Sequence, residues 1–433
     1  MDRIGPGQVD PGAAEVVDRL RRAGHTAYLA GGCVRDLLLG RPPNDWDVAT
    51  DADPDRVLEL FEHAVPVGAR FGIVLVRLEG GEYHVARFRR EGPYADGRRP
   101  ERVEFTGPEE DARRRDFTIN GLFHDPGGEG VIDHVGGLKD LEAGLVRAIG
   151  DPAERFAEDG LRTLRAVRLA ASLEFQIEPG TWQAVRDCAH MVDALAAERV
   201  RDELTRILVE GAAAKGFELL LASGLLERVL PEVAAFRGVQ QPPEHHPEGD
   251  VWEHVLLMLK QVDDLDGPPP TLAWGVLLHD VGKPPTFSES DRIRFHGHDE
   301  IGAEMVDGIA RRLRFSNRDT ERVRMLTAQH MRFPNARRMR PGKLKRFLRQ
   351  EGFDELLELH RIDCLSSHGM LDLHEFCREA LRASEEEEGK RLRPPPLLDG
   401  RDLIDLGLQP GPAFGEILRW VEEEQLEGRL RDR

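Results

Sequence analysis

The chain has 433 residues, 40% of them hydrophobic and 32% charged, and a formal net charge of −19. This is the composition of an ordinary soluble protein of about three domains, and its acidic balance argues against indiscriminate nucleic-acid binding. The sequence has no apolar N-terminal segment and no run of about 18 apolar residues, so neither export nor a membrane span is expected. Four cysteines without Cys-x-x-Cys spacing, at positions 33, 188, 364 and 377, indicate free thiols in a reducing cytoplasm.

A turn of two glycines is the main feature of the first part of the chain. After an expected helix over 13–22 and an expected strand over 26–30, Gly31 and Gly32 lead into a short helix over 34–39. Glycines at a strand-to-helix turn let backbone N–H groups approach a phosphate, and the helix N-terminus adds partial positive charge. Arg35 supplies a guanidinium fork that suits phosphate oxygens.

Two carboxylates, Asp45 and Asp47, follow this helix in a second expected strand. Alternate strand residues share a face, which places the two side chains together with Cα atoms about 6.5–7 Å apart. Such a pair repels itself unless a cation lies between its members, and Mg²⁺ held in this way also binds substrate phosphates. Alone, a Gly-Gly turn or an Asp-x-Asp is usually an ordinary turn or a solvated edge. Together, separated by one short helix, they indicate a nucleotidyl transferase.

The following residues complete a mixed α/β domain. Asp53-Pro54 is expected to begin a helix that runs to about position 63, and segments 72–78 and 82–88 are expected to form a hairpin. The polar segment 89–102 is expected to be a loop, either solvated or acting as a lid over an active site.

An Arg-Arg-Asp cluster comes next. Arg114, Arg115 and Asp116, with Asn120 close behind, could form only a surface salt-bridge cluster. Beside a nucleotide site, however, the Asp can accept hydrogen bonds from ribose hydroxyls while an Arg neutralises the triphosphate.

Beyond position 150 the sequence is predicted to be helical nearly to its end. In an expected helix over 154–173, polar residues recur every third position, at Asp159, Arg162, Arg165 and Arg168, and Glu158 precedes Arg162 by four residues. The stripe is either a solvated face with ion pairs or a surface whose Asp and Arg present acceptor and donor groups to a nucleobase. Further helices are expected over 181–189 and 198–210.

A proline-rich break over 241–247 predicts a domain boundary. After it, His254 lies on an expected helix, and a buried apolar run over 272–278 ends in His279-Asp280. With Asp363, these residues form a ligand set for a hydrolytic divalent metal whose identity they do not specify, and His298 and His330 could complete a second metal site. An acidic run over 385–388 is expected to be a solvated spacer before prolines 394–396 and a short helical tail.

These motifs resemble the class II tRNA nucleotidyltransferases, which include bacterial CCA-adding enzymes and poly(A) polymerases within the DNA polymerase β superfamily. The resemblance covers residues 28–237, and residues 246–363 resemble an HD-type phosphohydrolase domain. The motifs that carry it are Gly31-Gly32-Cys33-Val34-Arg35-Asp36 with Asp45 and Asp47, Arg114-Arg115-Asp116, and Glu158-Asp159-Gly160-Leu161-Arg162.

The resemblance implies an α+β fold: a small mixed α/β nucleotidyltransferase head over 1–150, an all-helical neck and body over 151–240, a helical HD-type domain over 241–380 and an acidic spacer with a helical tail over 381–433. Asp45 and Asp47 would bind Mg²⁺ and catalyse transfer, and His254, His279, Asp280 and Asp363 would hold a second divalent metal. The nucleotide-binding residues implied are Gly31, Gly32, Arg35, Arg114, Arg115, Asp116, Asn120, Glu158, Asp159, Arg162, Arg165 and Arg168.

The implied function is template-independent addition of CCA to tRNA 3′ ends from CTP and ATP, in the cytoplasm and without a membrane. Two departures from the family pattern bear on this prediction: His84, with Glu82 on the same face, stands where relatives often have Glu, and segment 68–72 lacks the paired basic residues typical of bacterial poly(A) polymerases. The full-length 89–102 loop favours CCA or A addition over CC addition. The alternatives are an A-adding enzyme or poly(A) polymerase, an HD-type phosphohydrolase acting on phosphoesters of RNA ends or nucleotides, and an inactive RNA-binding protein. The oligomeric state stays open.

Overall fold

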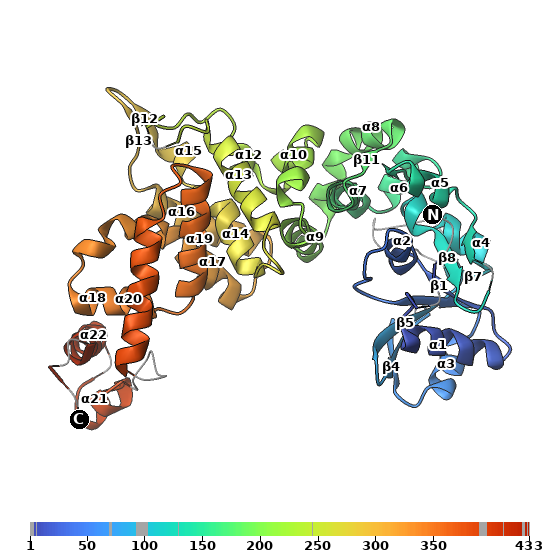
Figure 1. Cartoon of the computed structure of the whole chain (residues 1–433), viewed down its shortest axis with the longest axis horizontal. Coiled ribbons are helices and arrows are strands. Elements are labelled where there is room, and N and C mark those ends of the chain that lie inside the picture. Colours follow the sequence, from blue (N-terminus) through green and yellow to red (C-terminus); the bar gives the residue numbers. More distant parts are fainter. Residues whose placement is uncertain are drawn as a thin grey trace. The chain divides into compact units, whose positions relative to one another are not determined.

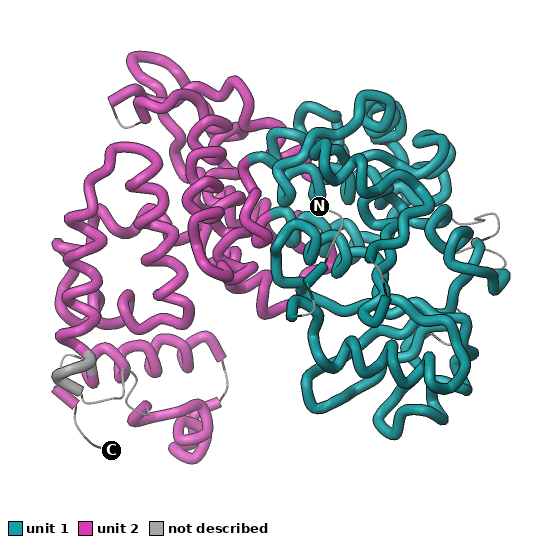
Figure 2. Tube along the Cα trace, turned by 45° about the vertical axis from the view of Figure 1, so that its right-hand side comes forward, with its two compact units in different colours: residues 1–207, 215–229 teal, residues 208–214, 230–433 magenta. Residues whose placement is uncertain are grey.

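The computed structural model describes residues 4–432 except 6, 69–71, 92–102, 129, 245, 389–395, 410, 427–428 and 431. The middle of the expected 89–102 loop, most of the 68–72 segment and the first two prolines of 394–396 therefore lie outside the described residues. The chain forms two compact units, Met1–Ile207 with Lys215–Val229 and Leu208–Ala214 with Leu230–Arg433 (Figure 2).

The first unit contains a seven-stranded sheet in the order β3-β4-β5-β2-β1-β8-β9 (Figure 1). Within this sheet the β2–β5 pair is parallel and the other five pairs are antiparallel. The strands are β1 (Ala27–Ala30), β2 (Asp47–Thr50), β3 (Ala64–Gly68), β4 (Ile73–Leu78), β5 (Gly81–Arg87), β8 (Leu122–Asp125) and β9 (Gly130–Asp133).

The mixed α/β head and its hairpin are confirmed. Strands β4 and β5 are antiparallel, with Val76 opposite Tyr83. The first residues of the 89–102 segment form β6 (Arg89–Glu91), which pairs with β7 (Val103–Phe105) directly after the segment, so residues 89–91 belong to a strand and not to a loop. The helices of the head are α1 (Pro11–Arg22), α2 (Gly32–Leu38), α3 (Pro54–Leu60), α4 (Pro108–Arg113), η2 (Thr118–Asn120) and α5 (Gly137–Glu142).

The expected single helix over 154–173 is wrong. The structure has two helices, α6 (Pro152–Glu158) and α7 (Leu161–Ser172), with Asp159 and Gly160 between them. Asp159 is extended, with φ −149° and ψ 102°, and the Cβ of any larger residue at Gly160 would lie 3.0 Å from the carbonyl oxygen of Met191. The remaining elements of this region are β10 (Leu145–Val146), β11 (Gln176–Ile177), α8 (Pro179–Asp187), η3 (Ala189–Ala194), α9 (Ala197–Val209), α10 (Ala213–Ser223), α11 (Leu226–Val229) and α12 (Pro231–Ala234).

The second unit is mainly helical, with one short hairpin that the helical prediction did not include, β12 (Phe287–Glu289) and β13 (Ile293–Phe295). Helix α14 is buried along its whole apolar run because it packs against α13, α17 and α19. The helices are α13 (Val251–Asp263), α14 (Pro270–Leu278), α15 (Lys283–Thr286), α16 (His298–Arg312), α17 (Asn317–Gln329), η4 (His330–Arg338), α18 (Pro341–Arg349), α19 (Phe353–Ser366), α20 (Asp372–Glu388), α21 (Gly400–Asp405) and α22 (Pro412–Leu426). Among the described residues no helix is long and apolar enough to cross a bilayer.

A buried histidine makes the stability of this second unit depend on pH. His360 of α19 is stacked on Phe333 with ring centroids 3.9 Å apart, and burial lowers the pKa of His360 from 6.5 to about 4. The unfolded chain takes up a proton near pH 6.5, whereas the folded state keeps this imidazole neutral. Its contribution to stability is therefore complete above pH 6.5 and is lost as the pH falls towards 4.

We expect the free energy of unfolding of the wild type, relative to that of His360→Gln, to fall by roughly 3 kcal/mol between pH 7 and pH 4. Urea denaturation of both proteins without added metal measures this difference. Subtracting the variant removes the contributions of the other histidines, and a difference that is constant with pH would contradict the prediction.

Candidate active sites

The turn after β1 has a backbone conformation that requires glycine. Gly31 has φ 78° and ψ −132°, and its N–H donates to the carbonyl oxygen of Leu122. A Cβ at this position would lie 2.7 Å from Arg115 Nη1 and 3.8 Å from Asp47 Oδ2. The turn thus brings backbone, a guanidinium and a carboxylate within a few ångströms of one another. Helix α2 begins at Gly32, two residues earlier than predicted, because the chain turns at Gly31 alone.

The two aspartates predicted to share a strand face are close together for another reason. Strand β2 begins at Asp47, and Asp45 lies in the bend before it, so the alternation argument for Asp45 was wrong. The carboxylates nevertheless interact: burial and the negative charge of Asp45 raise the pKa of Asp47. Among the described residues, no side chain donates a hydrogen bond to either carboxylate. A pair of neighbouring acids that accept no hydrogen bond from a described side chain has the donor chemistry of a hard-cation site.

The basic residues beside this pair are held by Asp111, which the sequence analysis did not identify. Asp111 is 1% exposed and forms ion pairs with Arg114 at 2.7 Å and Arg115 at 3.1 Å. Burial alone would raise the pKa of Asp111, but the two guanidinium groups lower it. One carboxylate therefore fixes both of the arginines that lie near Asp47.

A hydrogen-bonded network links five segments of the first unit. Arg35 Nη1 donates to Asn120 Oδ1 at 2.6 Å, and Asn120 Nδ2 donates to Asp116 Oδ1 at 3.0 Å. Arg165 joins Asp116 to Glu203 of α9, with both contacts at 3.3 Å, and Arg168 also donates to Glu203, at 2.8 Å. The predicted phosphate, ribose and helix residues thus meet in one network, whose central member in α9, Glu203, was not predicted.

The Glu158-Asp159-x-x-Arg162 motif is arranged around the break between α6 and α7. Arg162 is 6% exposed, and its guanidinium donates to Glu158 and to the carbonyl oxygen of Arg155. Both carboxylate oxygens of Asp159 accept from Arg199, at 3.1 and 2.7 Å. Neither Asp159 nor Arg162 is part of a freely solvated stripe, and Arg199 is a further member of this group that sequence spacing did not reveal.

Four histidines and two aspartates of the second unit form one largely buried cluster. His254, His279 and Asp363 offer ligand atoms that lie within 4.8 Å of one another, and so do Asp280, His298 and His330. His254 Nε2 is 3.3 Å from Asp363 Oδ1, and the Nε2 atoms of His298 and His330 are 3.2 Å apart. The structure therefore brings together all six residues predicted for this site, as two adjacent groups of three.

Burial and neighbouring charges shift the pKa values of several groups in this cluster. Burial and the positive charge of His279 lower the pKa of His330 to about 3, which keeps its imidazole neutral as a ligand. Burial opposes the charged form of His254, but hydrogen bonds to Asp363 and Glu248 raise the pKa of His254 to about 9. The pKa of Asp280 stays well below its usual value despite burial, because His279 and Lys283 are close. Lys283 Nζ lies 2.7 Å from Asp280 Oδ2 and donates to Gln241.

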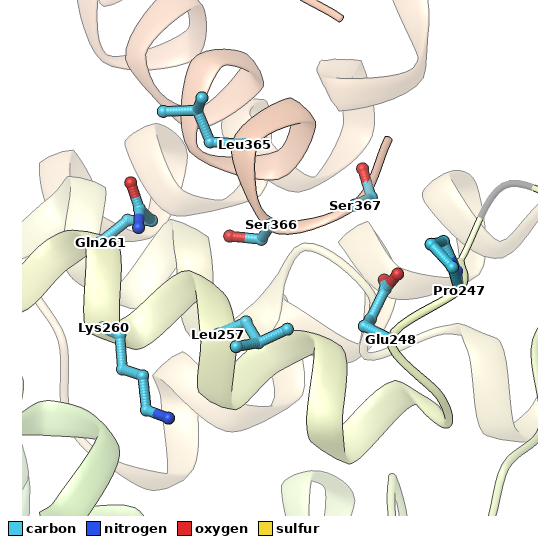
Figure 3. Close-up of a pocket in the computed structure, with 8 residues that line it drawn as sticks. All are labelled: Pro247, Glu248, Leu257, Lys260, Gln261, Leu365, Ser366 and Ser367. Atoms are coloured by element: carbon cyan, nitrogen blue, oxygen red, sulfur yellow. The ribbon is translucent and has the colours of Figure 1, made fainter. Parts of the chain in front are cut away.

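Glu248, which the sequence analysis did not predict, contacts His254 of the cluster and the neighbouring His246. Its Oε1 is 2.7 Å from His254 Nδ1 and 2.8 Å from His246 Nδ1. A carboxylate on the far nitrogen of a metal-binding imidazole fixes the ring and increases its basicity. Glu248 also lines a pocket of about 430 Å³ with Pro247, Leu257, Lys260, Gln261, Leu365, Ser366 and Ser367 (Figure 3). Within the described chain, Ser366 Oγ and the second oxygen of Glu248 have no hydrogen-bond partner, so the pocket suits water or a polar solute.

Glu248→Gln is expected to weaken Ni²⁺ binding to this cluster by about 10–100-fold, because the amide cannot hold the His254 ring as the carboxylate does. Calorimetric titration of the full-length protein with Ni²⁺ measures the affinity. Glu244→Gln, at an exposed position four residues earlier, is the matched control. Equal affinities of wild type and Glu248→Gln would contradict a supporting role for Glu248.

Comparison with known proteins identifies the family. Three family models match: the Poly A polymerase head domain over residues 27–147, the probable RNA and SrmB-binding site of polymerase A over 174–237, and the HD domain over 251–367. The CCA-adding enzyme of Lactobacillus johnsonii is 39% identical over 266 residues, or 59% of this chain and 66% of that enzyme. That of Streptococcus sanguinis is 43% identical over 226 residues, or 52% of this chain and 56% of that enzyme. These two alignments span less than two thirds of the relatives' own length.

A longer alignment decides the assignment. The CCA-adding enzyme of Lactobacillus delbrueckii subsp. bulgaricus is 31% identical over 424 residues, which are 97% of this chain and 94% of that enzyme. The chain belongs to the CCA-adding enzyme family. The solved CCA-adding enzyme of Bacillus stearothermophilus in complex with CTP is similar over 98% of this chain and 95% of that chain, with a TM-score of 0.68 and 25% identity. The Thermotoga maritima CCA-adding enzyme complexed with tRNA, at 18% identity and a TM-score of 0.56, shares the fold. The family and the fold class predicted for this chain are thus confirmed.

Proposed function

We propose that the protein adds CCA to the 3′ ends of tRNA, using CTP and ATP, at the Asp45–Asp47 site. One observation carries the proposal: two carboxylates without hydrogen-bond donors from described side chains stand beside the Gly31 turn and the Arg114–Arg115 pair. This combination can hold a cation and a triphosphate together. When bound, Mg²⁺ would activate the RNA 3′-hydroxyl and neutralise the charge on the departing pyrophosphate.

The chain's own residues supply binding and orientation. Asp45 and Asp47 would hold the cation, while the backbone after Gly31 and the guanidinium of Arg115 would contact the phosphates. Asp116, which accepts hydrogen bonds from Asn120 and Arg165, would accept from ribose hydroxyls. The helical regions would hold tRNA through its backbone shape, which suits a partner of varied sequence.

The test offers transcripts that end before CCA and transcripts that end after CC, with CTP and ATP supplied separately. We expect two nucleotides to be added to the first with CTP and one to the second with ATP. ATP addition alone would indicate an A-adding enzyme, long ATP-dependent tails would indicate a poly(A) polymerase, and no addition to either transcript would overturn the proposal.

Base selection is assigned to Arg162 and Asp159, because Glu158 and Arg199 fix their hydrogen-bonding groups in buried positions. Arg162→Lys keeps the charge but loses the planar fork. We expect this variant to select between CTP and ATP about 10-fold less strictly, since one mispaired buried group costs about 1–3 kcal/mol. Competition between the two nucleotides on each transcript measures selection. Arg186→Lys, on the exposed side of α8, is the control, and unchanged selection by Arg162→Lys would leave Arg162 with a structural role only.

A second function is favoured by the buried cluster of the HD domain. Its two adjacent groups of three ligands would hold divalent cations and cleave phosphoesters, such as 2′,3′-cyclic phosphates at RNA ends. Hydrolysis of a 2′,3′-cyclic phosphate breaks one P–O bond and leaves a terminal monophosphate on the RNA. An assay of this ring opening with added Ni²⁺, Mn²⁺ or Mg²⁺ tests the proposal, and if none of the metals supports it, the domain is a scaffold.

A further inference from the structure

A histidine lies directly beside the catalytic carboxylates. Strands β2 and β5 are parallel neighbours, and their register places His84 opposite Asp47. The backbone N–H of His84 donates to the carbonyl oxygen of Trp46 at 3.1 Å. This bond ties β5 to the residue that lies between Asp45 and Asp47. The imidazole Nδ1 is 3.9 Å from Asp47 Oδ1, and each of the two side chains is 44% exposed. The imidazole is thus held at the site by backbone register instead of by a loop.

The separation between the two side chains fits shared coordination better than a direct contact. At 3.9 Å, His84 Nδ1 is too far from Asp47 Oδ1 for a hydrogen bond. Two ligand atoms that each lie about 2.1 Å from one cation are about 3–4 Å apart, depending on the angle at the cation.

Glu82, the other possible ligand on this face of β5, already forms an ion pair. Glu82 lies two residues before His84 and opposite Arg77 of β4, and its Oε1 accepts from Arg77 Nε at 2.7 Å. Between them, Tyr83 points to the other face and is buried. His84 is therefore the β5 side chain that lies beside Asp47. The structure does not bring ligand atoms of His84, Asp45 and Asp47 all within 4.8 Å of one another, so a shared cation would draw these solvent-accessible side chains together.

We propose that His84 is the third protein ligand of the cation held by Asp45 and Asp47, through an imidazole nitrogen. The inference rests on the proposed nucleotidyl transfer. It gives the site a mixed nitrogen and oxygen donor set, in which Mn²⁺ and Co²⁺ gain affinity relative to Mg²⁺, a cation that prefers oxygen alone. The enzyme accordingly adds nucleotides with Mn²⁺ at lower cation concentrations than with Mg²⁺, and His84 sets that preference.

The decisive experiment combines spectroscopy with metal-dependent kinetics on the full-length protein. Pulsed electron paramagnetic resonance of the Mn²⁺ and CTP complex detects nitrogen coordinated to the ion. We compare the wild type with His84→Gln, because the histidines of the HD cluster are common to both and cancel in the difference. The expected result is a nitrogen modulation that the wild type shows and His84→Gln lacks.

Kinetics supply the second measurement. His84→Glu, which restores an oxygen ligand, is expected to lower the ratio of Mn²⁺-supported to Mg²⁺-supported kcat/KM for CTP addition by about tenfold. His63→Gln, at an exposed position outside the β2–β5 pair, is the control and leaves both measurements unchanged.

The outcomes separate this inference from the function on which it rests. If the wild type adds no nucleotide with any cation, the proposed transfer itself fails. If the wild type is active but shows the same nitrogen modulation and the same metal ratio as His84→Gln, His84 is not a ligand and transfer stands without it. Equal loss of activity with both metals and no spectral difference would place His84 on the nucleotide, and would also overturn the proposal.

Discussion

Asp47→Asn is expected to lower the rate of CTP and ATP addition by at least about 1,000-fold without lowering the thermal stability of the protein. The amide cannot hold a divalent cation as the carboxylate does, so stabilisation of the developing charge is lost. The same substitution is not expected to lower the stability of the folded protein. Because burial and Asp45 raise the pKa of Asp47, the folded state disfavours this charge at neutral pH, and a neutral side chain relieves the repulsion.

Single-nucleotide addition assays and thermal melting in the absence of metal measure the two effects. Asp55→Asn, which removes an exposed carboxylate from the first turn of α3, is the control and is expected to change neither. Wild-type turnover by Asp47→Asn would contradict the cation-binding role. A large drop in melting temperature would show instead that Asp47 is a structural residue.

Asp280→Asn is expected to abolish metal-dependent phosphoester hydrolysis and to destabilise the second unit. Asp280 is 1% exposed and is surrounded by His279, His298 and Lys283, so the substitution removes a ligand and leaves the Lys283 ammonium without its buried counter-charge. Removing one partner of a buried pair typically costs about 3–5 kcal/mol.

An assay of cyclic-phosphate ring opening measures the loss of hydrolysis, and urea denaturation measures the loss of stability. A second substitution, Lys283→Met combined with Asp280→Asn, is expected to recover stability but not hydrolysis, because it removes the orphaned ammonium without restoring the ligand. Glu300→Gln, an exposed acid in the first turn of α16, is the control. Hydrolysis that survives in a folded Asp280→Asn protein would exclude the cluster as the site of that reaction.

The parts of the fold that the sequence predicts well are those whose cause is local. The β4–β5 hairpin follows from two segments rich in apolar residues on either side of Gly80-Gly81, and the turn at Gly31 follows from a glycine at the end of a buried strand. The helix break at Asp159-Gly160 could not be predicted by periodicity, because the polar stripe has the same spacing whether the helix is continuous or broken. The break arises from the close approach of Met191 to Gly160, which is a tertiary contact.

The prediction of the site residues from the sequence was incomplete for a related reason. Motif residues such as Arg115, Arg165 and Asp159 are recognisable by type and spacing. Their respective partners Asp111, Glu203 and Arg199 lie at positions with no motif of their own. Asp111 and Glu203 are distinguished by being acids that are buried within helices. Burial is visible only once the chain is folded, so the sequence does not single them out. The relation of His84 to Asp47 likewise depends on strand register, which alternation along one strand does not determine.

The network from Arg35 through Asn120, Asp116 and Arg165 to Glu203 has a consequence for how an incoming nucleotide is received. Each of these side chains already has its neighbour before any ligand arrives, so the cost in conformational entropy of ordering them falls on folding and not on binding. Loosening one link, for example by shortening Glu203, would therefore reduce affinity for CTP and ATP alike, although Glu203 itself need not touch either nucleotide.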